Sequence, residues 1–309
     1  MKAIIVGSRG LAVGEVGETP VPPGKVRVKV RYAGIGFADV MAVGGGYPLA
    51  PRQPFSPGYE FFGETDGQPV AGIVPSMGCY RETLVVDPAW VVPVPGGVEP
   101  ETAAQVPLNY LTALAMVDRL AALKPGQSLW VLGAAGGVGT AVLEVARLRG
   151  VRAFGTAAEA KHPLVVSLGA TPLSRGALPP EKVDAVFDAF GVQSFRHSWR
   201  GLGPRGTLVA YGMSPDGDGG TGRFLAGALY LAGRMVLGGG RAVKICSAPL
   251  MIRSDPRWYR ESLAMVLGWA AEGKIRPTLG GILPWNQVVE AHRRLAAGEV
   301  RGKLLLEFP

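Results

Sequence analysis

A glycine-rich turn lies between an apolar strand and a helix near the middle of the chain. Ser128–Leu132 is a short apolar run, Gly133-Ala-Ala-Gly-Gly-Val-Gly139 follows it, and Thr140–Arg149 has a helical pattern. The first N–H groups of such a helix have no partner within it and carry the positive end of its dipole, so they can bind a pyrophosphate. Glycine suits the turn because a Cβ would block that approach. The segment therefore predicts a dinucleotide site, with a purely structural glycine turn as the alternative. The backbone atoms that would form the site belong to Ala135, Gly136, Gly137 and Val138.

The residues after the next strand indicate which dinucleotide would bind. The strand predicted at Val151–Thr156 leads to Ala157, which has no carboxylate for the ribose hydroxyls that NAD enzymes bind at this place. Glu159 lies beyond the strand end and is the other candidate for that role, whereas Lys161 could pair with a 2′-phosphate. Both side chains could also be ordinary solvated charges. We expect NADPH, bound in part by Thr156 and Lys161, with NADH as the alternative.

Strand and helix patterns alternate on both sides of this turn. Such alternation predicts a parallel, doubly wound sheet of an α/β fold. Further strands are predicted at Val183–Asp188, Gly206–Tyr211 and Met235–Gly238, and helices at Glu101–Leu123, Ser194–Arg200 and Trp258–Glu272.

The first hundred residues have a different pattern. Lys25–Ile35 alternates charged and apolar residues, as a half-buried strand does, and prolines divide the rest into short pieces. The last strand, Gly302–Phe308, can return to this β-rich part. We therefore expect a discontinuous catalytic domain of residues 1–105 and 276–309, with the dinucleotide domain at 106–275.

Composition limits the classes of function. The chain of 309 residues has a net charge of +8, which suits a solvated basic surface or a phosphate-rich ligand. It has no block of Lys and Arg, so nucleic acid is not an expected partner. Glycines interrupt the longest uncharged stretch, Pro125–Leu143, which argues against a membrane span. With only Cys79 and Cys246, a disulfide framework is not expected, and a cytoplasmic location is.

Several motifs resemble one enzyme family. Asn109-Tyr-Leu-Thr112-Ala113, the Gly133–Gly139 turn, Val183-Asp-Ala-Val-Phe-Asp188-Ala-Phe-Gly191 and Gly206-Thr-Leu-Val-Ala-Tyr211-Gly212 occur in this order. Pro57-Gly58-Tyr59-Glu60 precedes them, and Gly298-x-x-x-Gly302-Lys303 follows. Over nearly the whole chain, their order and spacing resemble the zinc-free quinone oxidoreductases of the zeta-crystallin type, in the medium-chain dehydrogenase/reductase superfamily. The resemblance implies a GroES-like catalytic domain and a Rossmann cofactor domain.

The resemblance also implies a site without metal. Zinc alcohol dehydrogenases of this superfamily take ligands from positions that match Gly36, Tyr59, and Leu108 or Asn109. Catalytic zinc needs three protein ligands with N, S or O donors, and this set does not supply them. We expect no zinc. The three histidines are far apart in the sequence, at His162, His197 and His292.

Site residues follow from the same resemblance. Tyr47 lies in a loop that lines the nicotinamide side in relatives, so it is a candidate for substrate contact or proton transfer, with simple loop packing as the alternative. Phe37 and Tyr59 are expected to shape the substrate pocket, with a place in the hydrophobic core as the alternative for either. Asp39 and Glu60 are expected to anchor the structure. The residues that would contact the cofactor are Asn109, Thr112, Tyr211, Gly212, Gly239 and Gly240.

These features together predict metal-free hydride transfer from NADPH to a quinone. Reduction of an enone, an enal or an enoyl thioester uses the same hydride geometry and is the first alternative. Arg241, Lys244, Arg253 and Arg257 could serve the phosphates of a coenzyme A thioester. A dinucleotide-binding protein with little turnover is the second alternative. The edge strand expected at Met235–Gly238 matches one through which relatives pair, so a homodimer is expected.

Overall fold

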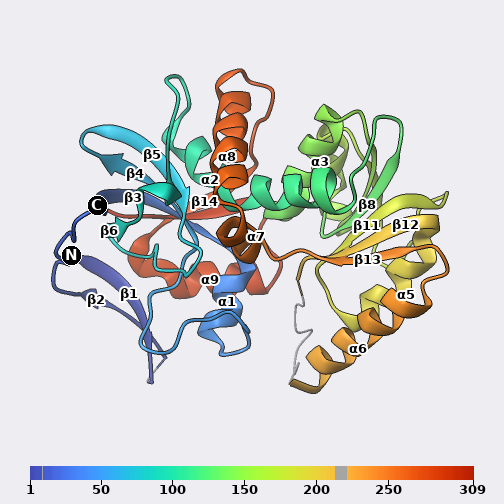
Figure 1. Ribbon diagram of the computed structural model, residues 1–309, viewed down its shortest axis with the longest axis horizontal. Helices are drawn as coiled ribbons and strands as arrows, with labels where there is room; N and C mark the ends of the chain where they lie inside the picture. Colours follow the sequence, from blue (N-terminus) through green and yellow to red (C-terminus); the bar gives the residue numbers. More distant parts are fainter. Residues whose placement is uncertain (9, 213–220) are drawn as a thin grey trace. The chain divides into compact units, whose positions relative to one another are not determined.

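The chain forms two compact units. The computed structural model describes residues 1–8, 10–212 and 221–309 (Figure 1). One unit contains Met1–Leu111 and Pro249–Pro309, and the other contains Thr112–Ala248. The chain therefore returns to the first unit at Pro249 and not at residue 276, the boundary expected from the sequence.

Helix α8 (Pro256–Ala271) accounts for this difference. The Tyr259 hydroxyl on α8 donates to the Trp90 carbonyl oxygen and accepts from the Ile73 N–H, each at 2.9 Å. Both partners belong to the first unit. The helix was expected in the dinucleotide domain, because contacts with residues so distant in sequence leave no local pattern.

The first unit is mainly β-structure. Its strands are β1 (Lys2–Gly7), β2 (Gly10–Glu15), β3 (Val26–Ile35), β4 (Glu60–Thr65), β5 (Gln68–Ile73), β6 (Thr83–Val86), β7 (Val91–Pro93), β14 (Leu279–Pro284) and β15 (Lys303–Glu307). Its helical segments are α1 (Phe37–Val43), η1 (Pro88–Trp90), α7 (Ala248–Ser254), α8, η4 (Trp285–Gln287) and α9 (Val288–Ala296). Helix α2 (Pro100–Leu114) belongs mostly to this unit and ends just inside the other.

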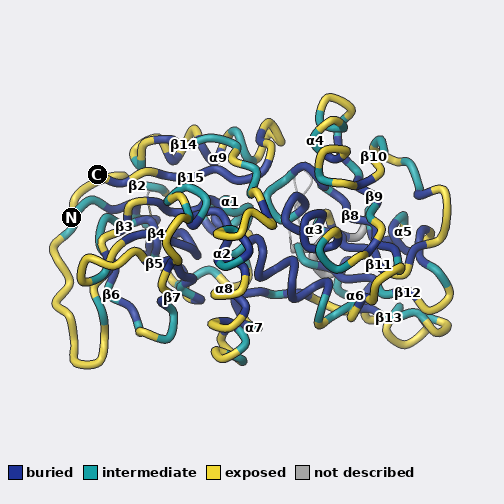
Figure 2. The backbone as a smooth tube through the Cα atoms, turned by 90° about the horizontal axis from the view of Figure 1, so that it is seen from above, coloured by how far each residue is buried: buried dark blue, intermediate teal, exposed yellow. Residues whose placement is uncertain are grey.

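A seven-stranded sheet forms the core of this unit. Its order is β14-β15-β3-β4-β5-β7, and β6 also pairs with β3. The charged residues of β3 are exposed and its apolar ones mostly buried, as the alternation predicted. The last strand, β15, pairs antiparallel with β3, with Leu304 opposite Ile35. The two ends of the chain thus build one core, whose buried segments appear dark in Figure 2.

The second unit alternates strands and helices. Its strands are β8 (Ser128–Leu132), β9 (Arg152–Thr156), β10 (Thr171–Leu173), β11 (Val183–Asp188), β12 (Leu202–Ala210) and β13 (Ala242–Ile245). Its helical segments are η2 (Ala115–Leu120), α3 (Gly137–Leu148), η3 (Glu159–Lys161), α4 (His162–Ser167), α5 (Val192–Gly201) and α6 (Thr221–Leu237).

All six strands run parallel, in the order β10-β9-β8-β11-β12-β13. This arrangement is the doubly wound, Rossmann-type sheet expected from the sequence. The chain builds outward from β8 through β9 to β10, and then resumes on the other side of β8 with β11. The order therefore reverses between β8 and β11, where sheets of this class bind their ligands.

The prediction of a strand at Met235–Gly238 is wrong. Met235 to Leu237 form the last turn of α6, and the strand follows later as β13. Gly239 and Gly240 make the intervening turn, with φ values of 59° and 89°. The apolar run alone suggested a strand, but it continues the helical pattern of the residues before it. The edge strand on this side is β13, whose Ile245 is exposed.

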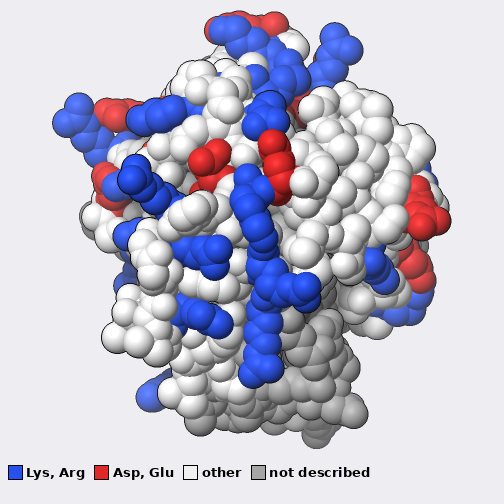
Figure 3. Space-filling model, turned by 90° about the vertical axis from the view of Figure 1, so that its right-hand side faces the viewer, with Lys and Arg blue, Asp and Glu red and all other residues white. Residues whose placement is uncertain are grey.

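One face of the molecule carries many of the basic residues. Figure 3 shows Lys and Arg side chains there among uncharged residues, several of them in a continuous stripe near the middle of the view, with few acidic ones between them. Among the described helices, none is both long and apolar enough to cross a membrane.

Candidate functional site

The turn after β8 lies at the carboxyl edge of the parallel sheet, at the point where the strand order reverses. All five residues of β8 are buried, and Gly133 then turns the chain with a φ of 73°. Helix α3 begins at Gly137 after Gly136, which has no side chain to cap it. The N–H groups of the first turn are therefore left for a ligand. Gly136, Gly137 and Val138 are partly exposed, whereas Ala135 is buried.

Close packing explains the glycines of this turn. A Cβ on Gly139 would lie 2.3 Å from the Gly133 carbonyl oxygen and 2.7 Å from the Cα of Ala134. A Cβ on Gly155 of β9 would lie 2.7 Å from the Cβ of Ala134. The Ala134 N–H donates to the Thr156 carbonyl oxygen at 3.0 Å. The start of α3 is thus held close to the ends of β8 and β9, as a pyrophosphate site requires.

The end of β9 places the residues expected near the adenosine ribose beside this turn. The Thr156 hydroxyl accepts a hydrogen bond from the Trp130 indole N–H of β8 at 2.8 Å. Glu159 is exposed and accepts from the Ser174 hydroxyl at 3.3 Å. Lys161 is half-buried at the end of η3. The residue at the strand tip itself is Ala157, so the carboxylate nearest to it in the sequence is that of Glu159.

Two further strand ends complete this edge. Tyr211 and Gly212 follow β12, and the Tyr211 hydroxyl donates to the Leu132 carbonyl oxygen at 3.2 Å. Phe190 follows β11, is 39% exposed, and has ring atoms 3.3 and 3.4 Å from where a Cβ on Gly133 would lie. Sequence reasoning missed Phe190 as a wall of the site, although it belongs to one of the motifs. Its position after a buried strand of the sheet is the signal that could have found it.

Gly239 and Gly240 lie at the opposite edge of the sheet. They precede β13, and Ala242 at its start pairs with Thr207, whereas Ile245 at its end pairs with Ala210. In a parallel sheet the loop before a strand lies at the amino edge, so these glycines do not join the cofactor site. The residue that follows β13 at the carboxyl edge is Cys246, whose N–H donates to the Ala210 carbonyl oxygen at 2.8 Å. Burial raises the pKa of the Cys246 thiol to about 12, so it is not a nucleophile at neutral pH.

Asn109 and Thr112 lie on α2 with a spacing that puts them on one face of the helix. Each is 6% exposed. The first belongs to the first unit and the second to the other, since the division falls between Leu111 and Thr112. Their expected contact with the nicotinamide stays a prediction.

The buried carboxylate of Asp39 connects two segments of the first unit that lie next to Phe37 and Tyr59, which were expected to shape the substrate pocket. It accepts hydrogen bonds from the N–H groups of Gly36 (2.7 Å) and Gly58 (3.0 Å) and from the Tyr80 hydroxyl (3.2 Å). These bonds connect the start of α1 to the segment that enters β4. Burial raises the pKa of Asp39 to about 6, and the two backbone hydrogen bonds oppose that rise. Asp39 has the anchoring geometry expected of it.

Glu60 is anchored as well, on the other side of Tyr59. Its Oε2 accepts from the Leu108 N–H at 2.8 Å, and its Oε1 forms a buried ion pair with the Lys303 ammonium. Tyr59 therefore stands between two backbone positions that are held by buried carboxylate interactions.

Tyr47 and Tyr59 come together. The Tyr59 hydroxyl donates to the Tyr47 hydroxyl at 3.1 Å, and the two rings meet edge to face with their centroids 6.2 Å apart. Tyr59 is 1% exposed, whereas Tyr47 is partly exposed. Phe37, at the start of α1, is also partly exposed. The structure thus pairs the two tyrosines that the sequence analysis singled out.

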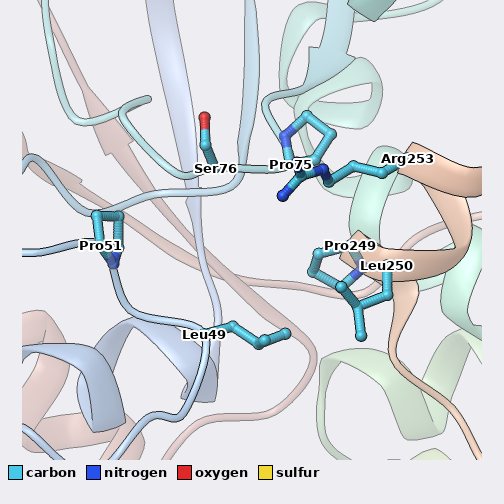
Figure 4. A pocket seen from close by; sticks show the side chains of 7 residues that line it. All are labelled: Leu49, Pro51, Pro75, Ser76, Pro249, Leu250 and Arg253. Carbon is cyan, nitrogen blue, oxygen red and sulfur yellow. The ribbon is translucent and has the colours of Figure 1, made fainter.

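A shallow groove of about 220 Å³ lies in the same unit (Figure 4). Leu49 and Pro51 come from the loop that carries Tyr47. Pro75 and Ser76 follow Val74, whose N–H donates to the Tyr59 carbonyl oxygen at 2.7 Å. The other side is contributed by α7, with Pro249, Leu250 and Arg253. The groove has mainly apolar walls and one cationic group. Two parts of its wall belong to chain segments that are next to Tyr47 in sequence or hydrogen-bonded to the backbone of Tyr59.

Comparison with known proteins shows the family. The chain is 30% identical to the quinone oxidoreductase-like protein 2 of Bos taurus, over 97% of this chain and 90% of that protein. The chain belongs to the quinone oxidoreductase-like family of medium-chain dehydrogenases/reductases. It is also 29% identical to the synaptic vesicle membrane protein VAT-1 homolog of Danio rerio, over 94% of this chain but only 65% of that longer protein.

Solved structures agree with membership of this family. The quinone oxidoreductase of Thermus thermophilus, whose structures include a complex with NADPH, superposes with a TM-score of 0.82. The two chains are 26% identical and cover each other completely. The GroES-like plus Rossmann architecture and the oxidoreductase class expected from the sequence are therefore confirmed.

A family model described as zinc-binding dehydrogenase matches residues 159–306 of this quinone oxidoreductase-like protein. The match raises the question of whether the chain has the zinc ligands of the superfamily. The matched range does not cover Gly36, Tyr59 and Leu108, which stand at the ligand positions. The structure brings these positions together: a Cβ on Gly36 would lie 3.6 Å from a methyl carbon of Leu108, and Asp39 connects Gly36 to Gly58. The only polar side chain among these three is a phenol, and Asn109, the alternative to Leu108, would add only an amide. Absence of zinc stays a prediction, and it rests on these residue types.

Proposed function

We propose that this protein reduces quinones with NADPH, by hydride transfer without a metal ion. The observation that carries the proposal is the start of α3, where a glycine turn leaves uncapped N–H groups at the point of strand-order reversal. A Cβ on Gly139 would collide with the Gly133 carbonyl oxygen and disturb this turn. The NADPH complex of the Thermus thermophilus relative supports the choice of cofactor.

The residues at this edge fit a dinucleotide. The backbone of Ala135, Gly136, Gly137 and Val138 would hold the pyrophosphate. Thr156 and Lys161 would bind the ribose and its 2′-phosphate, and Tyr211, Gly212, Asn109 and Thr112 would hold the nicotinamide end. When bound, the nicotinamide supplies the hydride.

The residues of the first unit would serve the acceptor. Phe37, Tyr47 and Tyr59 form its substrate pocket in this proposal. Burial raises the pKa of Tyr47, so its phenol stays protonated at neutral pH and can donate its proton to the oxygen of a reduced quinone. The protein's contribution is position and a partly dry surrounding for that transfer.

A steady-state assay tests the function. NADPH with 1,2-naphthoquinone should give saturable turnover, which 2-hexenal and crotonyl-CoA should not exceed. Lys161→Ala should weaken NADPH binding about tenfold and leave NADH binding unchanged, since only NADPH carries the 2′-phosphate. NADPH binding without turnover of any acceptor would indicate the binding protein, and turnover of the enal alone would replace the quinone assignment.

Arg253 favours enoyl-thioester reduction as a second candidate function. Of the basic residues considered for coenzyme A phosphates, Arg241 instead donates to the carbonyl oxygens of Gly203 and Leu202 at 2.9 and 3.0 Å. Arg257 pairs with Glu261 at 2.7 Å. Arg253 is exposed at the groove, beside apolar walls. An acceptor with an apolar chain and an anionic group would match that arrangement.

We also infer a homodimer in the cytoplasm. Among the described residues β13 is the last strand of its sheet, so its outer edge could pair with a second copy, in place of the segment Met235–Gly238 expected from the sequence. The two cysteines are buried and unbonded, which suits a reducing compartment. If the protein sediments as a monomer at micromolar concentration, the proposal of a dimer is wrong.

A further inference from the structure

The hydrogen bond between Tyr59 and Tyr47 joins a fixed phenol to one that is less constrained. Tyr59 directly follows Gly58 and directly precedes Glu60, whose backbone and side-chain interactions with Asp39, Leu108 and Lys303 hold both sides of it. Tyr47 follows Gly44, Gly45 and Gly46 in an exposed loop. Among the described residues, the Tyr59 hydroxyl is the only hydrogen-bond partner of the Tyr47 hydroxyl, at 3.1 Å.

Burial determines the direction of this hydrogen bond. Tyr59 is 1% exposed, and within the described residues its hydroxyl has no other hydrogen-bond partner. If Tyr47 were the donor, the Tyr59 proton would be buried without an acceptor, which costs free energy. With Tyr59 as the donor, that proton is satisfied and the proton of the partly exposed Tyr47 remains available.

We propose that Tyr59 is a positioning residue, which holds the Tyr47 oxygen so that the Tyr47 proton faces the acceptor. The inference rests on the proposed function and goes beyond it, since it gives the two tyrosines different tasks. The hydride that a bound NADPH would supply leaves the cofactor's C–H bond with both electrons and adds to the acceptor, which is left with an anionic oxygen. The Tyr47 O–H bond then breaks, its proton passes to that oxygen, and water re-protonates the phenolate.

The electrostatics of the pair agree with this division. Burial raises the pKa of both phenols; the hydrogen bond from Tyr59 opposes part of that rise at Tyr47, whereas donating the bond raises the pKa of Tyr59 further. The nearby Asp39 carboxylate raises the pKa of both. Tyr47 is therefore the stronger acid of the two, and it is also the one that reaches the surface.

A double-mutant cycle tests the inference on the full-length enzyme. Tyr47→Phe should lower kcat about 100-fold, as loss of a general acid does, with a small change in KM. Tyr59→Phe should lower kcat about tenfold, again with little change in KM. In the Tyr47→Phe background, Tyr59→Phe should have no further effect, because its task is already lost.

Tyr32→Phe is the matched control. This tyrosine is also buried in the first unit, and its hydroxyl donates to Glu101 at 2.7 Å, away from the pair. Its kcat should stay within twofold of the wild type. The solvent isotope effect on kcat gives a second measurement, and it should rise in Tyr59→Phe as proton transfer becomes slower.

Each outcome decides the inference. Equal losses from Tyr59→Phe in both backgrounds, or a Tyr47→Phe enzyme with wild-type kcat, would overturn it while leaving quinone reduction intact. A folded wild-type protein that binds NADPH but reduces no acceptor would overturn the proposed function itself, and the inference with it.

Discussion

The α-carbon of Gly139 lies so near the carbonyl oxygen of Gly133 that a methyl group on it would stand 2.3 Å from that oxygen. No rotation can relieve this contact, because the opposing atoms are backbone. The relationship fixes the first turn of α3 against the end of β8, and thereby the N–H groups on which the cofactor site depends.

Gly139→Ala should therefore disturb the cofactor site and the unit that contains it. We expect a loss of about 1–3 kcal/mol or more in the free energy of unfolding, and at least a tenfold loss of NADPH affinity. Urea unfolding and calorimetry measure the two effects. Gly268→Ala in α8 is the matched control, since a Cβ there meets no atom within 4 Å. That change should be neutral or slightly stabilising, because alanine favours a helix. Equal behaviour of the two variants would contradict this packing argument.

The buried ion pair of Lys303 and Glu60 should be costly to break from one side. Their side chains are 3% and 0% exposed, so Lys303→Met leaves a buried carboxylate without its partner. We expect a loss of about 3–5 kcal/mol in the free energy of unfolding, and partial recovery when Glu60→Gln is added. The exposed pair of Arg257 and Glu261 provides the control, and Arg257→Met should cost less than about 1 kcal/mol. A Lys303→Met loss as small as that of the control would refute the prediction.

His292 should make the protein less stable in acid. Burial lowers its pKa from 6.5 to about 4, so the folded state keeps it neutral while the unfolded state takes up a proton below pH 6.5. Its contribution is complete above that pH and is lost as the pH falls toward 4, by about 2 kcal/mol at pH 5.

His292→Leu removes this titration. Unfolding by urea at pH 8 and pH 5 should show a smaller acid loss in the variant, by about 2 kcal/mol, than in the wild type. An unchanged difference between the two pH values would show that His292 does not titrate in this way.

Arg253 should distinguish the two candidate substrate classes. If the groove binds an anionic acceptor, Arg253→Ala should raise KM for crotonyl-CoA about tenfold and leave KM for 1,2-naphthoquinone unchanged. Arg257→Ala is the control, because that guanidinium is already paired with Glu261. Equal KM values for crotonyl-CoA in all three proteins would exclude the groove from substrate recognition.

The sequence predicted the strand–turn–helix unit of the expected cofactor site well, because its determinants are local. The bounds of β8 and β11 agree with the structure, since each is a continuous apolar run next to turn residues. The Gly133–Gly139 turn is likewise a pattern within one strand–turn–helix unit.

Features that depend on distant contacts could not be predicted in this way. Met235 to Leu237 resemble a strand until the rest of α6 is known. Gly239 and Gly240, assigned to the cofactor from the resemblance, precede β13 and so lie at the amino edge of the sheet. Helix α8 belongs to the first unit through Tyr259, whose partners Ile73 and Trp90 are more than 160 residues away. Tyr47 and Tyr59 are only 12 residues apart, but the position of Tyr59 depends on contacts of its neighbours Gly58 and Glu60 with Asp39, Leu108 and Lys303, most of them distant in sequence.

Calorimetric titration of the purified protein with NADPH and then with NADH tests the central claim most directly. The claim is that the start of α3 holds a dinucleotide. It predicts saturable binding of one NADPH per chain, with weaker binding of NADH. No measurable binding of either nucleotide to a folded protein would contradict it.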